Sequence, residues 1–290
     1  MNERKSILIP GFRMGKIIAI TSGKGGVGKT MSTINMALAC AKSGAKVLIV
    51  DGDLGLSNVD VVMGLEPKGT LKDVLDGRLK IGEIISSTTQ GIDVISSGSG
   101  VAQLANMTPL SRSFLVHELS RIPDRYDYVF LDTGAGISDS VLTLNSVSDF
   151  FVVVTTPEPH AITDAYALIK LMAEEHDRHE CALIVNQVIN SDEGKRVALK
   201  LAEVSKQYCG SVVHHAGSVV TDVSLVRTIL ARRVGSDNAL SSLCGQGWGQ
   251  AWCNVSQIIK NDVLAHRSAG LSSVWQAISC PVQGRQNLDP

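Results

Sequence analysis

The chain has 290 residues, of which 44% are hydrophobic and only 4% aromatic, so its core has to be built from aliphatic side chains. Its 27 basic and 28 acidic residues leave a formal charge of −1, which excludes the general cationic field that attracts nucleic acid or anionic lipid. Six cysteines without a Cys-x-x-Cys pair are neither a disulfide framework nor a zinc site, and they favour reduced thiols.

The N-terminal stretch, residues 1–15, mixes charged side chains with a short apolar run and lacks the long apolar core of a signal peptide. No window of the sequence approaches the length of a membrane span. We therefore expect a soluble cytoplasmic protein in which residues 1–15 form an extension ahead of the first strand.

A β-branched run at residues 17–22 leads into a glycine-rich loop, and small and apolar residues at 31–43 predict a helix behind it. Gly23 and Gly28 precede a Lys-Thr pair at the spacing of a phosphate-binding P-loop. In such a loop, backbone N–H groups and the helix N-terminus face the phosphates, and residues without a Cβ allow the close approach. The alternative is a glycine-rich turn with a chance lysine, which the flanking strand and helix disfavour.

The same loop carries the predicted ligands of the nucleotide and the metal. Lys29 would reach the β- and γ-phosphates, and the Thr30 hydroxyl would coordinate Mg²⁺. The predicted ATP-binding residues of the loop are Gly25, Gly26, Val27, Gly28, Lys29 and Thr30.

A second buried strand, residues 47–50, runs directly into Asp51 and Asp53. The carboxyl ends of parallel strands are where α/β sheets bind their ligands. We expect Asp51 to face the metal and Asp53 to meet the attacking water. The alternative for both residues is a turn with an aspartate cap.

Another apolar strand, residues 126–131, ends in Asp132. This is the Walker B arrangement, in which a carboxylate holds Mg²⁺ through a water molecule. The glycine-containing loop at 133–138 suits a segment that switches with the γ-phosphate.

The remaining pattern alternates strands with helices. Strands are predicted at 91–98, 150–154, 181–187 and 211–213, and helices at 70–75 with Thr70 as N-cap, from Thr163 or Asp164 onwards, and at 195–208. This alternation predicts an α/β fold with a mostly parallel, doubly wound sheet and helices on both faces, in one domain spanning residues 16–233.

The motif at residues 24–30, Lys-Gly-Gly-Val-Gly-Lys-Thr, resembles the deviant Walker A motif of the MinD/ParA superfamily of P-loop ATPases. The resemblance implies a MinD-like fold, ATP and Mg²⁺ as ligands, and an ATP-dependent homodimer. In that dimer Lys24 would cross to the nucleotide of the other subunit and stabilise developing charge as an arginine finger does. The alternative for Lys24 is a solvated loop charge.

The resemblance also implies roles outside the loop. Asp53 would orient or activate the water, and Asn58 would sense the γ-phosphate. Asn186, at the end of a strand, matches the asparagine that contacts adenine, where an amide can both donate and accept; a turn residue is the alternative. Asp222 fits the base-flanking loop, although Val220 replaces the proline that relatives carry there.

A narrower resemblance comes from the sequence Asp-Thr-Gly-Ala-Gly-Ile-Ser at 132–138, where most MinD and ParA proteins have proline in place of Gly134. This form, with the stretches at 58–75 and 155–170, is similar to the flagellar number regulators of the FlhG/FleN type. The implied partner is a flagellar transcription activator, or a flagellar GTPase or basal-body protein. Residues 1–13 lack the activator motif of the FlhG-type proteins, which speaks against stimulation of that GTPase.

The last segment, residues 234–290, changes character. It contains a Gly-, Ser- and Gln-rich stretch and all three tryptophans. Two helix-spaced apolar stripes can be drawn, namely Trp252, Val255, Ile259 and Val263, and Leu271, Val274, Trp275 and Ile278. We expect a weakly helical or poorly ordered tail, or helices that pack on the domain. Contact with the inner face of the cell membrane is the less favoured alternative.

These observations lead to one functional prediction: a slow Mg²⁺-dependent ATPase that dimerises on ATP and regulates flagellar number, placement or gene expression through partner proteins. Its alternatives are a ParA-like DNA-partition ATPase, a MinD-like division-site regulator, and a nucleotide-gated binding module without turnover. The balanced charge disfavours nucleic acid as a partner.

Overall fold

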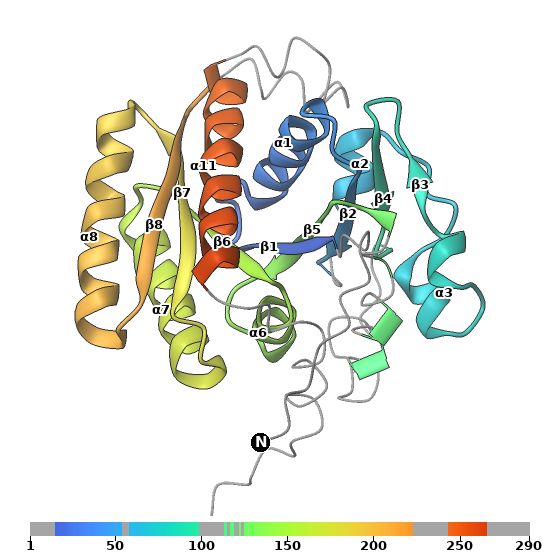
Figure 1. Ribbon diagram of the computed structural model, residues 1–290, viewed down its shortest axis with the longest axis horizontal. Coiled ribbons are helices and arrows are strands. Elements are labelled where there is room, and N and C mark those ends of the chain that lie inside the picture. Colours follow the sequence, from blue (N-terminus) through green and yellow to red (C-terminus); the bar gives the residue numbers. More distant parts are fainter. Residues whose placement is uncertain are drawn as a thin grey trace, which may run out of the picture.

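The computed structural model describes residues 15–53, 58–98, 113–114, 117–118, 122, 125–222 and 243–265. In this part of the chain a single sheet runs through the centre of the molecule, with helices above and below it (Figure 1). Its order is β3-β4-β2-β5-β1-β6-β7-β8, and all neighbouring strands are parallel except the pair β3 and β4. The predicted α/β fold with a mostly parallel sheet is confirmed.

The strands are short and rich in β-branched side chains, as buried parallel strands are. Their bounds are β1 Lys16–Ser22, β2 Val47–Gly52, β3 Ser86–Ser87, β4 Ile92–Ile95, β5 Tyr128–Ala135, β6 Phe150–Thr155, β7 Glu180–Val188 and β8 Val212–Val220. The helices are α1 Lys29–Lys42, α2 Val59–Met63, α3 Leu71–Leu75, the 3₁₀ turn η1 Ile81–Glu83, α6 Asp139–Ser146, α7 Pro159–His176, α8 Ser191–Cys209 and α11 Leu243–Ala265.

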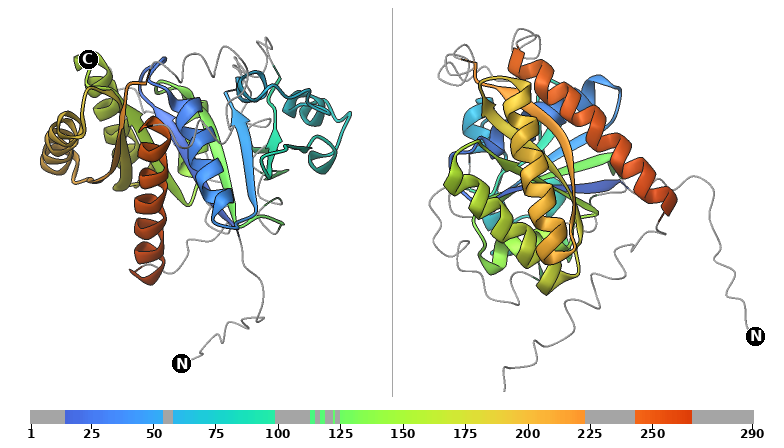
Figure 2. Two further views of the ribbon diagram at one scale, coloured as in Figure 1. Left: turned by 90° about the horizontal axis from the view of Figure 1, so that it is seen from above. Right: turned by 90° about the vertical axis from the view of Figure 1, so that its left-hand side faces the viewer.

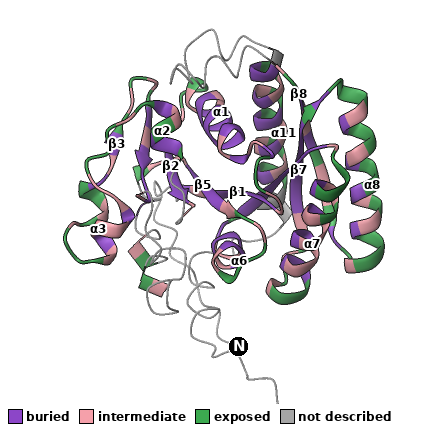
Figure 3. Ribbon diagram, turned by 180° about the vertical axis from the view of Figure 1, so that it is seen from behind, coloured by how far each residue is buried: buried purple, intermediate pink, exposed green. Residues whose placement is uncertain are grey.

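The alternation of side chains along β1 divides the core into two layers. Ile18 and Ile20 pack with α1 and α11 on one face of the sheet. Ile17 and Ala19 point to the other face, which α3, α6, α7 and α8 cover. Figure 3 shows the buried strands between helices whose outer faces are exposed. Both faces of the central strands are therefore buried, and the carboxyl ends of these strands are left to bind a ligand.

Helix α7 begins earlier than the sequence indicated. The prediction placed its start at Thr163 or Asp164, but the helix begins at Pro159. Proline is favoured in the first turn because its φ already suits a helix and its missing N–H would have no partner there. The prediction for α3 is confirmed, because the backbone N–H and the hydroxyl of Thr70 both bind Asp73 Oδ2, at 2.9 and 2.8 Å.

The strand β8 extends beyond the predicted residues 211–213 and includes Val219 and Val220, which the sequence had suggested for the base-flanking loop. It forms the edge of the sheet beside β7. Asp222 therefore follows the end of β8 directly.

The C-terminal segment differs most from expectation. Helix α11 has 23 residues and lies alongside α1 and β8 (Figure 2). Trp248 is fully buried, and Trp252, Val255 and Ile259 are buried with it in the core. Of the two expectations, helices that pack on the domain are found at residues 243–265, where Trp252, Val255 and Ile259 of the first apolar stripe are buried, and a weakly helical or poorly ordered segment is not. The second stripe lies outside the described residues, and the boundary at 233 stays a prediction.

No described helix has the length and apolar character needed to cross a membrane.

Candidate nucleotide-binding site

The glycine-rich loop connects the end of β1 to the start of α1, as the spacing predicts. Its last residue, Gly28, has φ 88° and stands at the N-cap of α1. A Cβ there would lie 2.2 Å from Asn186 Nδ2, and a Cβ on Gly23 would lie 2.2 Å from the carbonyl oxygen of Asp164. Glycine is therefore required at both ends of the loop, by crowding at Gly23 and by crowding and left-handed backbone geometry at Gly28.

A charged cluster sits at the first turn of α1. The ammonium of Lys29 lies 3.0 Å from Asp132 Oδ1, and the Thr30 hydroxyl donates to Asp132 Oδ2 at 2.7 Å. The Thr33 hydroxyl adds a bond of 2.9 Å to Oδ1. Lys29 is 7% exposed and Asp132 is 1% exposed, so each neutralises the other in a dry environment.

The sequence motifs for the P-loop and the Walker B strand thus meet in space. Lys29 and Thr30 come from the loop and Asp132 from the end of β5, which pairs directly with β1. Thr33 was missed by sequence reasoning, although its place one helical turn after Lys29 was a usable signal.

Asp51 lies next to Asp132 in the sheet, because the two residues are register partners on β2 and β5. The Asp51 carboxylate is buried and accepts backbone N–H bonds from Asp53 at 3.0 Å, Asn58 at 3.0 Å and Val59 at 3.2 Å. Asp51 therefore holds the backbone at the start of α2 and at Asp53. Residues 54–57, between these two points, lie outside the described residues. Its predicted role at the metal stays a prediction.

Asp53 follows the last residue of β2 directly. Its carbonyl oxygen accepts the Ser97 hydroxyl at 3.0 Å, which ties it to the end of β4. A Cβ on Gly134 would lie 4.0 Å from Asp53 Oδ1 and 3.3 Å from Val141 Cγ2. Gly134, in the stretch that is similar to the FlhG/FleN type, thus lies close to the residue predicted to place the water.

Lys24 forms an ion pair with a residue outside the loop. Its ammonium lies 2.7 Å from Glu158 Oε2, immediately before α7. The hydrogen bond and the positive charge of Lys24 hold the pKa of Glu158 below its usual range. Sequence reasoning missed Glu158, although it lies in the stretch at 155–170 that carried the resemblance.

Two side chains at the end of β7 bind the backbone of the loop. The side-chain amides of Asn186 and Gln187 donate to the carbonyl oxygens of Val27 at 2.8 Å and Gly26 at 3.3 Å. Gln187 has φ 58°, an uncommon geometry for a residue other than glycine. Asn186 thus positions the loop, and its predicted contact with adenine stays a prediction.

Asp222 lies near the start of α11. The Cys244 thiol donates to its Oδ2 at 3.6 Å. The structure therefore connects the predicted base-flanking loop with the C-terminal helix, a contact that no sequence motif indicated.

The donors of the site suit a polyphosphate with magnesium. A buried ammonium, the N-terminus of α1 and the exposed backbone of Gly25 and Gly26 converge at the loop. No group of three or more His, Cys, Asp or Glu side chains in the described residues could hold a metal alone. A magnesium ion would therefore depend on Thr30, on phosphate oxygens and on waters held by the nearby carboxylates, which fits the chemistry of that ion.

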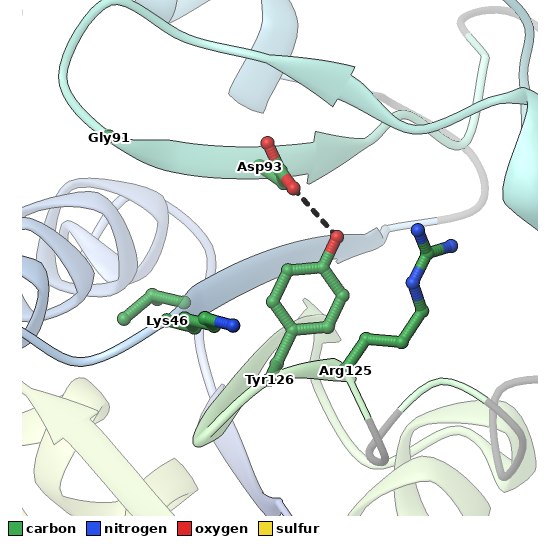
Figure 4. A pocket seen from close by; sticks show the side chains of 6 residues that line it. Lys46, Gly91, Asp93, Arg125 and Tyr126 are labelled. Carbon is green, nitrogen blue, oxygen red and sulfur yellow. Dashed lines mark hydrogen bonds between the residues drawn. The ribbon is translucent and has the colours of Figure 1, made fainter.

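A separate cavity of about 430 Å³ lies at the opposite, amino-terminal end of β2, β4 and β5 (Figure 4). In it the Tyr126 hydroxyl donates to Asp93 Oδ2 at 2.7 Å, with Lys46 and Arg125 on either side of the ring. None of the predicted site residues lines it, so this cavity is distinct from the loop that would hold the nucleotide.

Comparison with known proteins agrees with this geometry. The family model described as an AAA domain matches residues 15–185, which is more than half of the chain. The antiactivator FleN of Pseudomonas aeruginosa is 36% identical over 218 residues, covering 75% of this chain and 78% of that protein. The flagellum site-determining protein YlxH of Helicobacter pylori is 33% identical over 264 residues, covering 91% and 89%.

Solved structures show the same fold. The cell division ATPase MinD of Pyrococcus furiosus superposes with a TM-score of 0.70 at 23% identity, covering 84% of this chain and all of that one. MinD of Aquifex aeolicus gives a TM-score of 0.67 at 27% identity, covering 84% and 97%. The loop, the buried Lys29–Asp132 pair and these relatives lead to one conclusion. The chain belongs to the MinD/ParA superfamily of P-loop ATPases and, within it, to the FlhG/FleN type.

Proposed function

We propose that this protein is a Mg²⁺-dependent ATPase switch that dimerises on ATP and regulates flagella through a partner protein. The observation that carries the proposal is the cluster of Lys29, Thr30 and Asp132 at the N-terminus of α1, behind an intact deviant Walker A loop. Such a cluster offers a cation for the phosphates and a hydroxyl that can bind the magnesium ion beside them.

Phosphate binding would use the loop itself. The ammonium of Lys29 and the backbone amides of residues 25–30 would neutralise the β- and γ-phosphates. Thr30 would coordinate Mg²⁺, with Asp51 and Asp132 holding its waters. The bound metal would screen the charge that develops on the phosphates.

Hydrolysis would need three further residues. Asp53 would place the attacking water. Asn58, at the start of α2, would sense the γ-phosphate. Lys24 of the partner subunit would then approach the transferred phosphoryl group. This arrangement makes dimerisation a condition of turnover.

The proposed partner is a flagellar transcription activator. The relative from Pseudomonas aeruginosa is named an antiactivator, and the one from Helicobacter pylori is named for determining the site of flagella. A flagellar GTPase or basal-body protein is the second candidate; residues 1–13 lack the activator motif, which speaks against stimulation of the GTPase.

The deciding experiment uses the full chain with the substitution Asp53→Ala. With Mg-ATP this variant should elute as a dimer, and in a pull-down from cell extract it should retain a DNA-binding activator. Lys29→Ala, which should not bind nucleotide, is the matched control. Calorimetry without any heat of nucleotide binding, together with one unchanged particle size with and without Mg-ATP, would refute the proposal.

Membrane contact through the C-terminal segment stays a separate prediction. In the described part of that segment, Trp252, Val255 and Ile259 are already buried against the sheet. The second apolar stripe, Leu271, Val274, Trp275 and Ile278, would be the one to contact lipid. Sedimentation with anionic liposomes, with and without residues 266–290, would test it.

A further inference from the structure

A buried hydrogen bond joins the C-terminal helix α11 to α1, the helix that follows the phosphate loop. The indole N–H of Trp248 donates to the Ser32 hydroxyl at 3.1 Å, although the two residues are 216 positions apart in sequence. Both side chains are fully buried. A buried indole N–H without a partner costs free energy, so this contact fixes the two helices relative to each other.

Ser32 passes the contact to the loop. Its hydroxyl donates to the carbonyl oxygen of Gly28 at 3.0 Å, and its backbone N–H donates to the same oxygen at 2.9 Å. The hydroxyl has only one proton, so accepting from Trp248 leaves that proton directed at Gly28.

The carbonyl of Gly28 and the N–H of Lys29 belong to one planar peptide unit and point in opposite directions. Holding the carbonyl along α1 therefore turns the Lys29 N–H out of the helix N-terminus, toward the place where phosphate would lie. This matters because Gly28 has φ 88° and lacks the side chain that would restrict its backbone in most residues.

Helix α11 is held firmly enough to act as a support. A Cβ on Gly247 would lie 3.1 Å from the carbonyl oxygen of Ser218, and a Cβ on Gly217 would lie 3.1 Å from Ala251 Cβ. The side-chain amide of Asn254 donates to the Ala216 carbonyl at 2.7 Å. These contacts seat α11 on β8, so Trp248 has a fixed position.

We infer that Trp248 is a positioning residue of the phosphate loop: through the Ser32 hydroxyl it orients the Gly28–Lys29 peptide for a nucleotide phosphate. This inference rests on the proposed binding of ATP. By linkage, a nucleotide in the loop stabilises the Trp248 contact as much as the contact strengthens the nucleotide.

The test compares Trp248→Phe with Trp252→Phe in the full chain. Both substitutions keep an aromatic ring on α11 and lose similar area, and Trp252 packs on Tyr128 and Phe130, away from the loop. Each variant should lower the melting temperature of the free protein. Only Trp248→Phe should weaken the affinity for Mg-ADP in calorimetry, by about fivefold, the factor of one net hydrogen bond.

Ser32→Ala is the second variant, since it removes the acceptor and leaves the indole in place. It should reproduce the loss of affinity, and combining it with Trp248→Phe should add little, because both remove the same link. Indole NMR gives an independent readout: the Trp248 N–H resonance should shift with Mg-ADP and that of Trp252 should not.

Equal affinity losses for the two tryptophan variants, unchanged affinity in Trp248→Phe, or fully additive losses with Ser32→Ala would each overturn the inference. A wild-type chain that takes up no nucleotide would overturn the proposed function as well. An unchanged affinity in Trp248→Phe beside a wild-type chain that binds Mg-ADP would overturn this inference alone.

Discussion

Lys24 and Glu158 form an ion pair of 2.7 Å within one chain, between the phosphate loop and the start of α7. The lysine that would serve the partner subunit is thus paired with an acidic side chain of its own chain. Because both side chains are partly exposed, the pair contributes little to stability and can exchange for another partner at low cost.

Replacing Lys24 should therefore separate nucleotide binding from dimerisation. We expect Lys24→Ala to bind Mg-ATP with nearly wild-type affinity and to remain a monomer, since the ammonium is paired with Glu158 and its proposed role lies at the nucleotide of the other subunit. Size-exclusion chromatography with light scattering measures the change. Glu158→Gln, which keeps Lys24, is the control and should still dimerise; a dimer of Lys24→Ala would contradict the assignment.

Asp53→Ala should bind ATP and dimerise but hydrolyse it roughly a hundredfold more slowly, the usual effect of losing a group that activates a water. Its side chain lies after β2, outside the buried Lys29–Asp132 cluster, so binding should survive. Phosphate release under single-turnover conditions measures the rate. If the variant hydrolysed ATP at the normal rate, another residue would have to place the water.

The parts of the site that could be predicted from sequence are those set by local spacing. Gly28, Lys29 and Thr30 follow one strand and open one helix, so their order fixes their geometry. Asp132 was predictable because an apolar strand ends at it. Glu158 and the contact between Trp248 and Ser32 were not, since these residues belong to no local motif and each contact joins segments more than a hundred residues apart.

Helix α11 shows why composition misled the prediction for the tail. Glycine has a low intrinsic helix propensity, and the stretch around Gly247 therefore looked weakly helical. In the structure the missing side chains of Gly217 and Gly247 let α11 approach β8 closely, and packing decides the outcome. Tertiary contacts of this kind cannot be read from a single segment.

Lys29→Ala should abolish measurable nucleotide binding and also destabilise the free protein. Among the described residues, loss of the ammonium leaves the buried Asp132 carboxylate with the hydroxyls of Thr30 and Thr33, a change that costs about 3–5 kcal/mol. Calorimetry measures the first effect and urea unfolding the second. Lys29→Arg keeps the charge and should recover most of the stability; equal instability of both variants would argue against the ion pair.

Gly28→Ala should damage the loop even without nucleotide. Its backbone has φ 88°, and the new Cβ would lie 2.2 Å from Asn186 Nδ2. The left-handed geometry alone costs at least about 1 kcal/mol. Gly25→Ala is the matched control, because a Cβ there meets nothing within 4 Å and should leave the unfolding free energy of the free protein unchanged. Equal losses in the two variants would contradict this geometry.

The free protein should lose stability as the pH falls from 7 toward 5, in part through His176. Burial at the end of α7, aided by Arg178 and opposed by Glu175 and Asp139, lowers the pKa of His176 below its ordinary value of 6.5. Below 6.5 the unfolded chain therefore binds more protons at this residue than the folded one. The stability contributed by neutral His176 is thus fully present above 6.5 and is lost as the pH falls through the pKa of His176 in the folded protein. Urea unfolding of His176→Gln should show a shallower dependence on pH than that of the wild-type protein. Identical slopes in wild type and His176→Gln would show that other groups carry the effect.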